Sequence, residues 1–336
     1  MRTTFENLDR MIGHTPMVGI DYQYNGNAGT VYAKCEYYNL SGSIKDRMAL
    51  SILQKAYKNG EISPDSTIVE ATSGNAGISF AALGRMLGHK IHIIMPDWVS
   101  RERKLLLESY GAEVQLVSKE EGGFMETVRI SQEMAENDPK VFLPCQFANY
   151  NNVKAHEETT GTEILTQLKG EGLSPDAFVA GIGTGGTVVG VGNAIRAVNK
   201  DAKIHPLEPE ESPILLTGHK KGCHRIQGLS DGFIPEIVDL STLDDVVDVS
   251  DGDAILMAQK LSSSLGLGVG ISSGANMVGA IKLQEKYGFK TVVATVFADC
   301  NKKYLSTDLM KEEPVKDHHI SPNVELLDFF VLKRAF

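Results

Sequence analysis

The sequence predicts an α/β protein of two domains, each an open, mostly parallel sheet flanked by helices. Short apolar runs typical of buried strands alternate with longer stretches of helical periodicity. Glycine directly follows several helical stretches, where it commonly ends a helix. Such alternation favours a parallel sheet covered by helices. A chain of 336 residues, 42% of them hydrophobic, can bury two cores.

The first half of the chain shows this alternation clearly. Three helices are predicted to end beside Gly60, Gly88 and Gly111. The expected helices cover 44–58, 78–87, 101–110 and 124–136, and the expected strands 67–70, 90–95, 113–117 and 141–143. The alternation of strands and helices resumes from 177 to 297, beginning with a strand over 177–182 and a helix over 188–198. Ligands should collect at the carboxyl ends of the strands.

Lys45 lies in the segment SGSIKDR (41–47), at the entrance of the first of these helices. Most lysines are ordinary surface residues. A cation in the first turn, however, has the unfavourable sign for the helix dipole, so the placement is mildly costly unless it has a use. Because a lysine amine can form a Schiff base with an aldehyde cofactor, Lys45 is a candidate cofactor ligand.

A polar turn, Thr72-Ser73-Gly74-Asn75, joins the strand over 67–70 to the next helix. Ser, Thr and Asn are favoured helix N-caps, so this turn alone could be purely structural. Backbone N–H groups and short polar side chains at a helix entrance can equally hold a carboxylate or a phenolate oxygen. Combined with a Schiff-base lysine, the turn suggests a site for pyridoxal phosphate (PLP).

A loop rich in glycine and threonine, GIGTGGT (181–187), follows the strand over 177–182. Bare N–H groups at a helix N-terminus make such a loop a phosphate cradle. Its glycines also satisfy G-x-G-x-x-G, with Glu208 near the expected place of a ribose-binding acid, so an NAD-dependent oxidoreductase is an alternative. That fingerprint usually follows the first strand of its fold, whereas several strand–helix units come first here.

Ser272 and Ser273 open another predicted helix within GISSGAN (270–276). A serine hydroxyl could face the nitrogen of a pyridine ring and leave it unprotonated, whereas an aspartate would protonate it. Taken alone, the segment is explained more simply by a serine N-cap.

Together and in this order, the four segments resemble the family of cysteine synthase (O-acetylserine sulfhydrylase) and cystathionine β-synthase, which are PLP enzymes of fold type II. The resemblance extends from about residue 7 to about residue 309 and includes IGHTP (12–16), QF (146–147), HEETTG (156–161) and IQG (226–228). It implies a smaller domain over 40–148 that binds the substrate carboxylate. A larger domain over 1–39 and 149–311 would bind the cofactor phosphate, and 312–336 would form a tail.

The resemblance also implies a role for each candidate residue. Lys45 would carry the cofactor and later move the α-proton of the substrate. Asn75 would bind the phenolic oxygen of the cofactor, and Ser272 its ring nitrogen, with Ser273 as the close alternative. No metal is expected. The phosphate would be held by Gly183, Thr184, Gly185, Gly186 and Thr187, and the substrate carboxylate by Thr72, Ser73 and Gln146.

Three positions depart from the family pattern. Ala76 replaces a threonine, and Cys300 replaces a common serine. Asp231 stands where sulfhydrylases usually carry a small neutral residue, and it could simply be a turn aspartate bonded to its own backbone. If it faces the substrate instead, its charge would disfavour hydrosulfide and could orient or deprotonate water.

The resemblance therefore implies a lyase or transferase of amino-acid metabolism that performs β-elimination or β-replacement on a β-substituted L-alanine through an α-aminoacrylate. With Lys45 and Asp231 as catalytic residues, we expect an L-cysteine lyase that releases hydrogen sulfide and forms L-serine by water addition. O-acetylserine sulfhydrylase is the alternative. Thiol exchange of the cystathionine β-synthase type and NAD-dependent oxidation are weaker alternatives.

Composition limits the partners. The net charge of −10 argues against binding nucleic acid or an anionic membrane surface. Four cysteines without metal-ligand spacing favour a reducing compartment. No apolar run is long enough to cross a membrane, and the polar start of the chain does not resemble a signal peptide. We expect a cytoplasmic enzyme for a small amino acid, cysteine or O-acetylserine, and the resemblance implies a homodimer.

Overall fold

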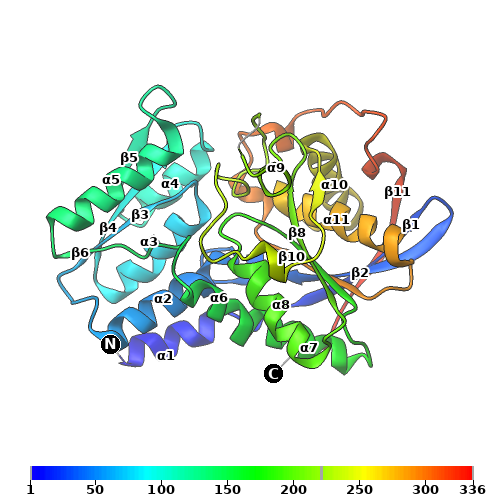
Figure 1. Ribbon diagram of the computed structural model, residues 1–336, viewed down its shortest axis with the longest axis horizontal. Helices are drawn as coiled ribbons and strands as arrows, with labels where there is room; N and C mark the ends of the chain where they lie inside the picture. The colour runs from blue at the N-terminus through cyan, green and yellow to red at the C-terminus, as the bar shows by residue number, and fades with distance from the viewer. Residues whose placement is uncertain (1, 220–221, 335–336) are drawn as a thin grey trace.

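A four-stranded parallel sheet forms one part of the molecule, on the left of Figure 1. Neighbouring residues of its strands face opposite sides. Ile93 points to a core shared with α2 and α3, and Ile94 to a smaller cluster beneath α5. The strands follow the order β5–β4–β3–β6, namely β5 (Glu113–Val117), β4 (Lys90–Pro96), β3 (Thr67–Ala71) and β6 (Val141–Phe142), and the helices are α2 (Lys45–Asn59), α3 (Asn75–Leu87), α4 (Arg101–Ser109) and α5 (Gly123–Asn137).

A seven-stranded sheet forms the other part of this computed structural model, which describes residues 2–219 and 222–334. In this sheet the strands β2, β10, β7, β8 and β9 run parallel to one another, whereas β1 and β11 add an antiparallel edge. The order is β11 (Val324–Val331), β1 (Met17–Tyr24), β2 (Asn27–Cys35), β10 (Val293–Phe297), β7 (Ala177–Gly181), β8 (Lys203–Pro209) and β9 (Val247–Val249).

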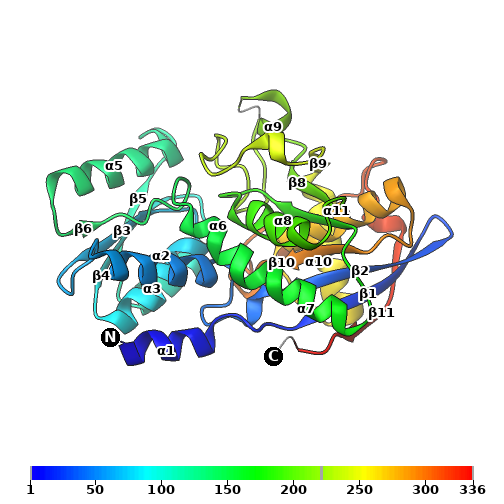
Figure 2. The same cartoon turned by 60° about the horizontal axis from the view of Figure 1, so that its bottom comes forward.

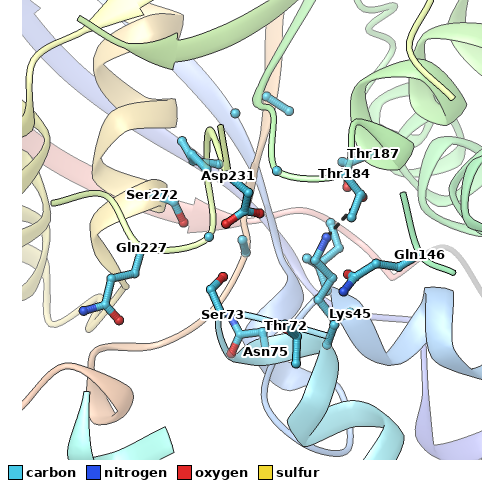
Figure 3. Close-up of a pocket in the computed structure, with 18 of the residues that line it drawn as sticks. Lys45, Thr72, Ser73, Asn75, Gln146, Thr184, Thr187, Gln227, Asp231 and Ser272 are labelled. Atoms are coloured by element: carbon cyan, nitrogen blue, oxygen red, sulfur yellow. Dashed lines mark hydrogen bonds between the residues drawn. The ribbon is translucent and has the colours of Figure 1, made fainter. Parts of the chain in front are cut away.

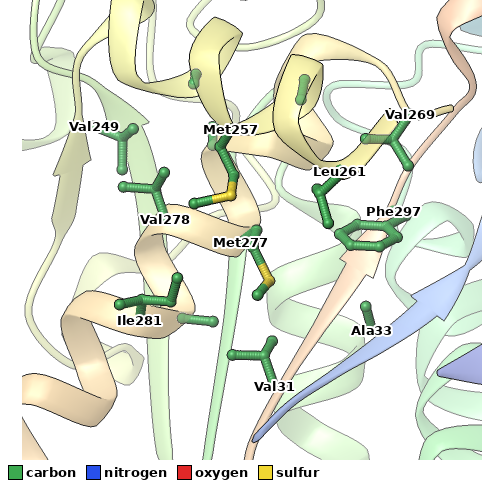
Figure 4. Packing of buried hydrophobic residues seen from close by; sticks show 14 of the residues in the cluster. Val31, Ala33, Val249, Met257, Leu261, Val269, Met277, Val278, Ile281 and Phe297 are labelled. Atoms are coloured by element: carbon green, nitrogen blue, oxygen red, sulfur yellow. The ribbon is translucent and has the colours of Figure 1, made fainter. Parts of the chain in front are cut away.

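Helices cover both faces of the larger sheet. On one face α10 (Asp251–Leu265) and α11 (Ile271–Tyr287) pack against β2 and β10, with Met257, Met277 and Phe297 among the buried side chains in Figure 4. The other face carries α7 (Thr162–Gly170) and α8 (Gly186–Val198). Shorter helical segments are α6 (Asn151–Ala155), a π-helix (His156–Gly161), α9 (Ile214–Thr217), and 3₁₀ turns over Glu36–Tyr38, Leu240–Thr242, Asn301–Lys303, Asp308–Met310 and Ser321–Asn323.

The predicted fold class is confirmed, since both sheets are mostly parallel and flanked by helices (Figure 1 and Figure 2). The predicted helix over 78–87 begins earlier, at Asn75, so the polar turn runs directly into α3. Two antiparallel pairings were not predicted, that of β1 with β2 and that of β1 with β11. Strands β1 and β2 form a hairpin whose turn, Asn25-Gly26, has positive φ angles of 49° and 77°. Asn-Gly is the strongest short hairpin signal in a sequence, so this element was detectable.

The tail and the N-terminus both join the fold. Strand β11 pairs with β1, and the two lie side by side at the right of Figure 1. Helix α1 (Arg2–Met11) packs against α2 and α3, and its Leu8 belongs to the core beside the smaller sheet. The domain boundaries expected at 39/40, 148/149 and 311/312 stay a prediction. Helix α1, expected in the larger domain, packs against helices beside the smaller sheet, and β11, expected in the tail, joins the larger sheet. None of the helices within 2–219 and 222–334 is long and apolar enough to cross a membrane.

A buried ionic cluster ties α2 to the larger sheet. Arg47 contacts Glu36 through Nε at 2.6 Å and Glu163 through Nη1 at 2.6 Å. Lys34 of β2 contacts the second oxygen of Glu163 at 2.8 Å. Burial alone would raise the pKa of Glu163, but the hydrogen bonds and charges of Arg47 and Lys34 outweigh it and lower this pKa to about 2. The first turn of α2, which also carries Lys45, is therefore fixed in place.

Glu163→Gln should destabilise the protein by about 3 kcal/mol at neutral pH, because buried Lys34 loses the carboxylate that it contacts and Arg47 is left with Glu36. A carboxyl with a lowered pKa stabilises the fold above its unfolded value and loses this effect as the pH falls. The difference between parent and variant should thus shrink as the pH drops below about 4.5. Urea unfolding across this range measures it. Glu133→Gln, in an exposed pair with Arg129, serves as the control and should change stability by less than about 1 kcal/mol.

Candidate active site

One cavity opens at the carboxyl ends of β3, β7 and β10, with its walls drawn from both sheets. Figure 3 shows the polar side chains that point into it. Of the predicted site residues, Gly185 and Gly186 are not part of its lining, and neither is Ser273, the alternative to Ser272. The lining includes Lys45, Thr72, Ser73, Asn75, Gln146, Gly183, Thr184, Thr187, Asp231 and Ser272.

Lys45 is the first residue of α2, and its amine reaches the cavity, where Nζ donates to Oγ1 of Thr184 at 3.3 Å. The helix start is held from the larger sheet, because the backbone N–H of Ile44 donates to the carbonyl of Ala298 at 2.9 Å. Burial lowers the pKa of Lys45 to about 8, although the charge of Asp231 acts to raise it. A larger fraction of this amine is therefore neutral and nucleophilic at neutral pH.

The loop between β7 and α8 requires its glycines. A methyl group on Gly183 would lie 2.2 Å from the carbonyl oxygen of Gly228, and one on Gly186 would lie 2.0 Å from Oδ1 of Asn152. Gly185 has a φ of 85°, in the left-handed region. The loop thus leads into the N-terminus of α8 without side chains over its backbone, as a phosphate cradle does.

Asn75 begins α3 and is held by two residues that sequence reasoning did not select. Its Nδ2 donates to Asp299 at 2.7 Å, and its Oδ1 accepts from Nζ of Lys303 at 2.9 Å. Both partners lie just after β10 and are buried. They fix the amide at the edge of the cavity. The sequence signal was their place after a predicted strand, in the segment ADCNKKY (298–304).

The turn before α3 and Gln146 also line the cavity. Thr72 accepts a hydrogen bond from the N–H of Gly74 at 3.0 Å through its hydroxyl oxygen, which shapes the turn. Gln146 donates from Nε2 to the carbonyl of Ala71 at 3.2 Å and to Glu70 at 3.3 Å. Burial raises the pKa of Glu70 to about 8. Gln146 and the turn are therefore fixed to each other.

Arg103 is a third residue that the sequence analysis missed. It is buried on α4, where Nη1 donates to the carbonyl of Ser73 at 3.2 Å and also to Gln227. Its Nη2 donates to the hydroxyl of Tyr304 at 2.9 Å. Arg103 therefore links the turn before α3 to the loop that carries Asp231.

The structure also places the two positions that the sequence left open, the serine at the start of α11 and Asp231. Ser272, at the start of α11, lines the cavity, whereas Ser273 is fully buried and does not. Asp231 also lines the cavity, and Figure 3 shows its carboxylate directed into it. It lies between two residues with positive φ, Ser230 at 49° and Gly232 at 109°. Asp231 is thus more than a turn residue bonded to its own backbone.

A family model described as pyridoxal-phosphate dependent enzyme matches residues 8–299. The chain belongs to this family. It is 40% identical over 303 residues to a probable cysteine synthase of Bacillus subtilis, covering 90% of this chain and 97% of that protein. The crystal structure of the hydrogen sulfide-producing enzyme Fn1055 of Fusobacterium nucleatum is 51% identical, with a TM-score of 0.97 over 99% of this chain and 100% of that one. An Asp-to-Asn mutant of Fn1055 in complex with an α-aminoacrylate intermediate gives 52% identity and a TM-score of 0.95 over 97% of both chains.

The residues of this PLP-dependent enzyme fit the cofactor. The cavity holds an amine for its aldehyde, a glycine loop at a helix N-terminus for its phosphate, and a serine hydroxyl at the start of α11. The family, its cysteine synthase relatives and the structures of hydrogen sulfide-producing enzymes support β-elimination or β-replacement chemistry.

The NAD alternative is wrong. The matching family model is PLP-dependent, and the acid that was to hold a ribose is used inside the fold. Glu208 accepts hydrogen bonds from the N–H groups of Leu215 at 2.6 Å and Leu216 at 3.1 Å, and it does not line the cavity. It stabilises the start of α9 instead.

Replacing Thr184 and Thr187 together by alanine should weaken cofactor retention, because each hydroxyl lost from a charged phosphate costs about 1.5–3 kcal/mol. Retention is measured as the cofactor absorbance that survives dialysis. Thr162→Ala, exposed on α7, is the control and should retain cofactor like the parent. Equal retention by all three proteins would place the phosphate elsewhere.

Proposed function

We propose that this enzyme is an L-cysteine lyase that releases hydrogen sulfide and forms L-serine by adding water. The observation that carries the proposal is the carboxylate of Asp231 in the wall of the cavity that also holds Lys45. The 51% identity to the hydrogen sulfide-producing enzyme of Fusobacterium nucleatum adds support. In this reaction one cysteine and one water become one serine and one hydrogen sulfide.

When bound, PLP supplies an electron sink for the α-carbon of the substrate. We propose that Thr72, Ser73 and Gln146 hold the substrate carboxylate in the turn before α3. With the cofactor bound, the amine of Lys45 would be the base beside the α-carbon of the substrate. With its pKa lowered to about 8 by burial, against the raising effect of Asp231, its neutral form can take the α-proton as sulfide leaves.

Asp231 would then select the nucleophile for the β-carbon. A carboxylate about 4 Å from an incoming hydrosulfide anion repels it by about 1–4 kcal/mol, depending on the local dielectric. Water carries no charge and avoids this penalty. The same carboxylate can accept a proton from water as its oxygen bonds to the β-carbon. Serine is therefore the favoured product.

O-acetylserine sulfhydrylase is the second candidate, favoured by the 40% identity to a probable cysteine synthase. Product analysis separates the two. The enzyme is given L-cysteine in isotopically labelled water, and separately O-acetylserine with sulfide. We expect sulfide and labelled serine in equal amounts from cysteine. Efficient cysteine synthesis without any serine formation would favour the sulfhydrylase, and a thioether formed from cysteine and an added thiol would indicate exchange of the cystathionine β-synthase type.

We further propose a homodimer in the cytoplasm. The family resemblance supports the dimer, and unpaired thiols in the structure, such as the exposed Cys145 and Cys223, are compatible with a reducing compartment. Light scattering after size-exclusion chromatography tests the dimer, and cell fractionation tests the compartment.

A further inference from the structure

We infer that the C-terminal segment positions Asp231, through an ion pair between Glu313 and Arg225, and so helps to determine what adds to the substrate. The effect of this ion pair on product choice rests on the proposed function. Its effect on the conformation of the loop that carries Asp231 (222–231, here called the aspartate loop) is independent of the proposed function. Glu313 lies beyond residue 299, where the match to the family model ends.

The ion pair has two-point geometry. The Glu313 carboxylate accepts from both terminal nitrogens of Arg225, from Nη1 at 2.7 Å and from Nη2 at 2.7 Å. The Glu313 side chain is only 5% exposed, so water competes weakly for it. Asp308 adds a contact to Nη1 at 3.2 Å. A bidentate Arg–carboxylate pair fixes orientation as well as distance, so the Arg225 side chain has a defined direction.

Arg225 is also held on its other side. Its backbone N–H and its Nε both donate to Oδ2 of Asp251, at 2.8 Å and 3.3 Å. The N–H of Asp251, at the start of α10, in turn donates to the carboxylate of Glu211 at 3.0 Å. Asp251 of α10 therefore holds the Arg225 main chain, and the C-terminal segment holds its side chain.

Contacts inside the aspartate loop connect this clamp to Asp231. Nε2 of His224, the neighbour of Arg225, lies 3.3 Å from the carbonyl oxygen of Ser230. The N–H of Ser230 donates to the carbonyl of Ile182 at 2.9 Å, beside the phosphate loop. Ser230 has a φ of 49°, which is costly for a residue other than glycine and persists only with support from its surroundings. The direction of Asp231 follows from this supported conformation.

The segment that presents Glu313 is itself anchored. The Asp253 carboxylate of α10 accepts from the N–H groups of Ile320 at 3.0 Å and Ser321 at 2.8 Å. The hydroxyl of Ser321 donates to the carbonyl of Asp253 at 2.9 Å, and β11 then pairs with β1. Glu313 thus acts from a fixed part of the fold. It is a positioning residue, because it does not line the cavity.

The test compares Glu313→Gln with Glu312→Gln in the complete, cofactor-loaded enzyme. Glu312 is exposed and one residue away, so this control removes the same charge without touching Arg225. Hydrogen–deuterium exchange of peptides covering 222–234 should be faster in Glu313→Gln and unchanged in the control. With cysteine as substrate, the ratio of serine to pyruvate should fall on the order of tenfold in Glu313→Gln, the scale of a lost pairwise contact. Glu313→Asp, which keeps the charge, should recover part of both effects.

Unchanged exchange over 222–234 in a folded Glu313→Gln variant would overturn the inference, whatever the reaction. Faster exchange with an unchanged product ratio would overturn its catalytic part. If Glu313→Gln does not fold, Glu313→Asp and Arg225→Lys provide the same two measurements. If the parent itself makes no serine, the proposed function fails, and capture of sulfide with O-acetylserine as substrate replaces the product ratio.

Discussion

Lys45→Ala is expected to lower turnover by at least about a thousandfold, because the variant loses both the covalent tether of the cofactor and the base beside the α-carbon. General acid–base catalysis by one side chain alone increases a reaction rate by about 10²–10⁴-fold. The cavity offers no substitute, since Lys45 is the only lysine among its described lining residues. Borohydride reduction followed by peptide mapping should attach the cofactor to residue 45 in the parent and nowhere in the variant.

The Lys45→Ala experiment has a matched control, and the parent enzyme should capture PLP at a rate that depends on pH. Lys55→Ala removes an exposed lysine from the same helix and should leave turnover and labelling intact. Since burial lowers the pKa of Lys45 to about 8, the rate at which cofactor-free enzyme captures PLP should rise as the pH increases through this value. Steady-state turnover by Lys45→Ala with bound cofactor would refute the assignment.

The local pattern of the sequence was enough to predict much of the fold. The strand over 113–117 and the helix over 101–110 agree with β5 and α4 to within one residue, because glycine and alternating hydrophobicity mark their ends. The motif segments lie together, because the polar turn and the glycine loop follow β3 and β7, whose carboxyl ends border one cavity, and Lys45 reaches it from the start of α2. The roles of these residues stay a prediction.

Residues defined by long-range contacts could not be predicted in this way. Asp299 and Lys303 hold Asn75, more than two hundred residues away in the chain, and Arg103 joins two loops on different sheets. The place of Asp299 and Lys303 after a predicted strand was a local signal, but it did not show that they would contact Asn75, and nothing beside Arg103 sets it apart from an ordinary surface charge. Glu313 is similar, because its importance appears only once Arg225 lies beside it.

Asp231→Asn tests the choice of nucleophile, which the rest of the site leaves open. Asparagine keeps the shape of the side chain but removes its charge and its ability to accept a proton from water. Serine formation from cysteine should therefore fall by about 10²–10⁴-fold, while the first release of sulfide persists because Lys45 still takes the α-proton. Pyruvate should become the main organic product. Asp239→Asn, in an exposed loop, is the control and should keep the product ratio of the parent.

The variant should also reverse the preference between nucleophiles. Without the repulsion of about 1–4 kcal/mol, hydrosulfide should add more readily, so Asp231→Asn should make cysteine from O-acetylserine and sulfide faster than the parent does. Because the charge of Asp231 acts to raise the pKa of Lys45, the pH at which the variant captures PLP should move downward. A downward shift with unchanged serine output would show that Asp231 faces Lys45 without acting on water, and the choice of nucleophile would then lie with other residues of the cavity.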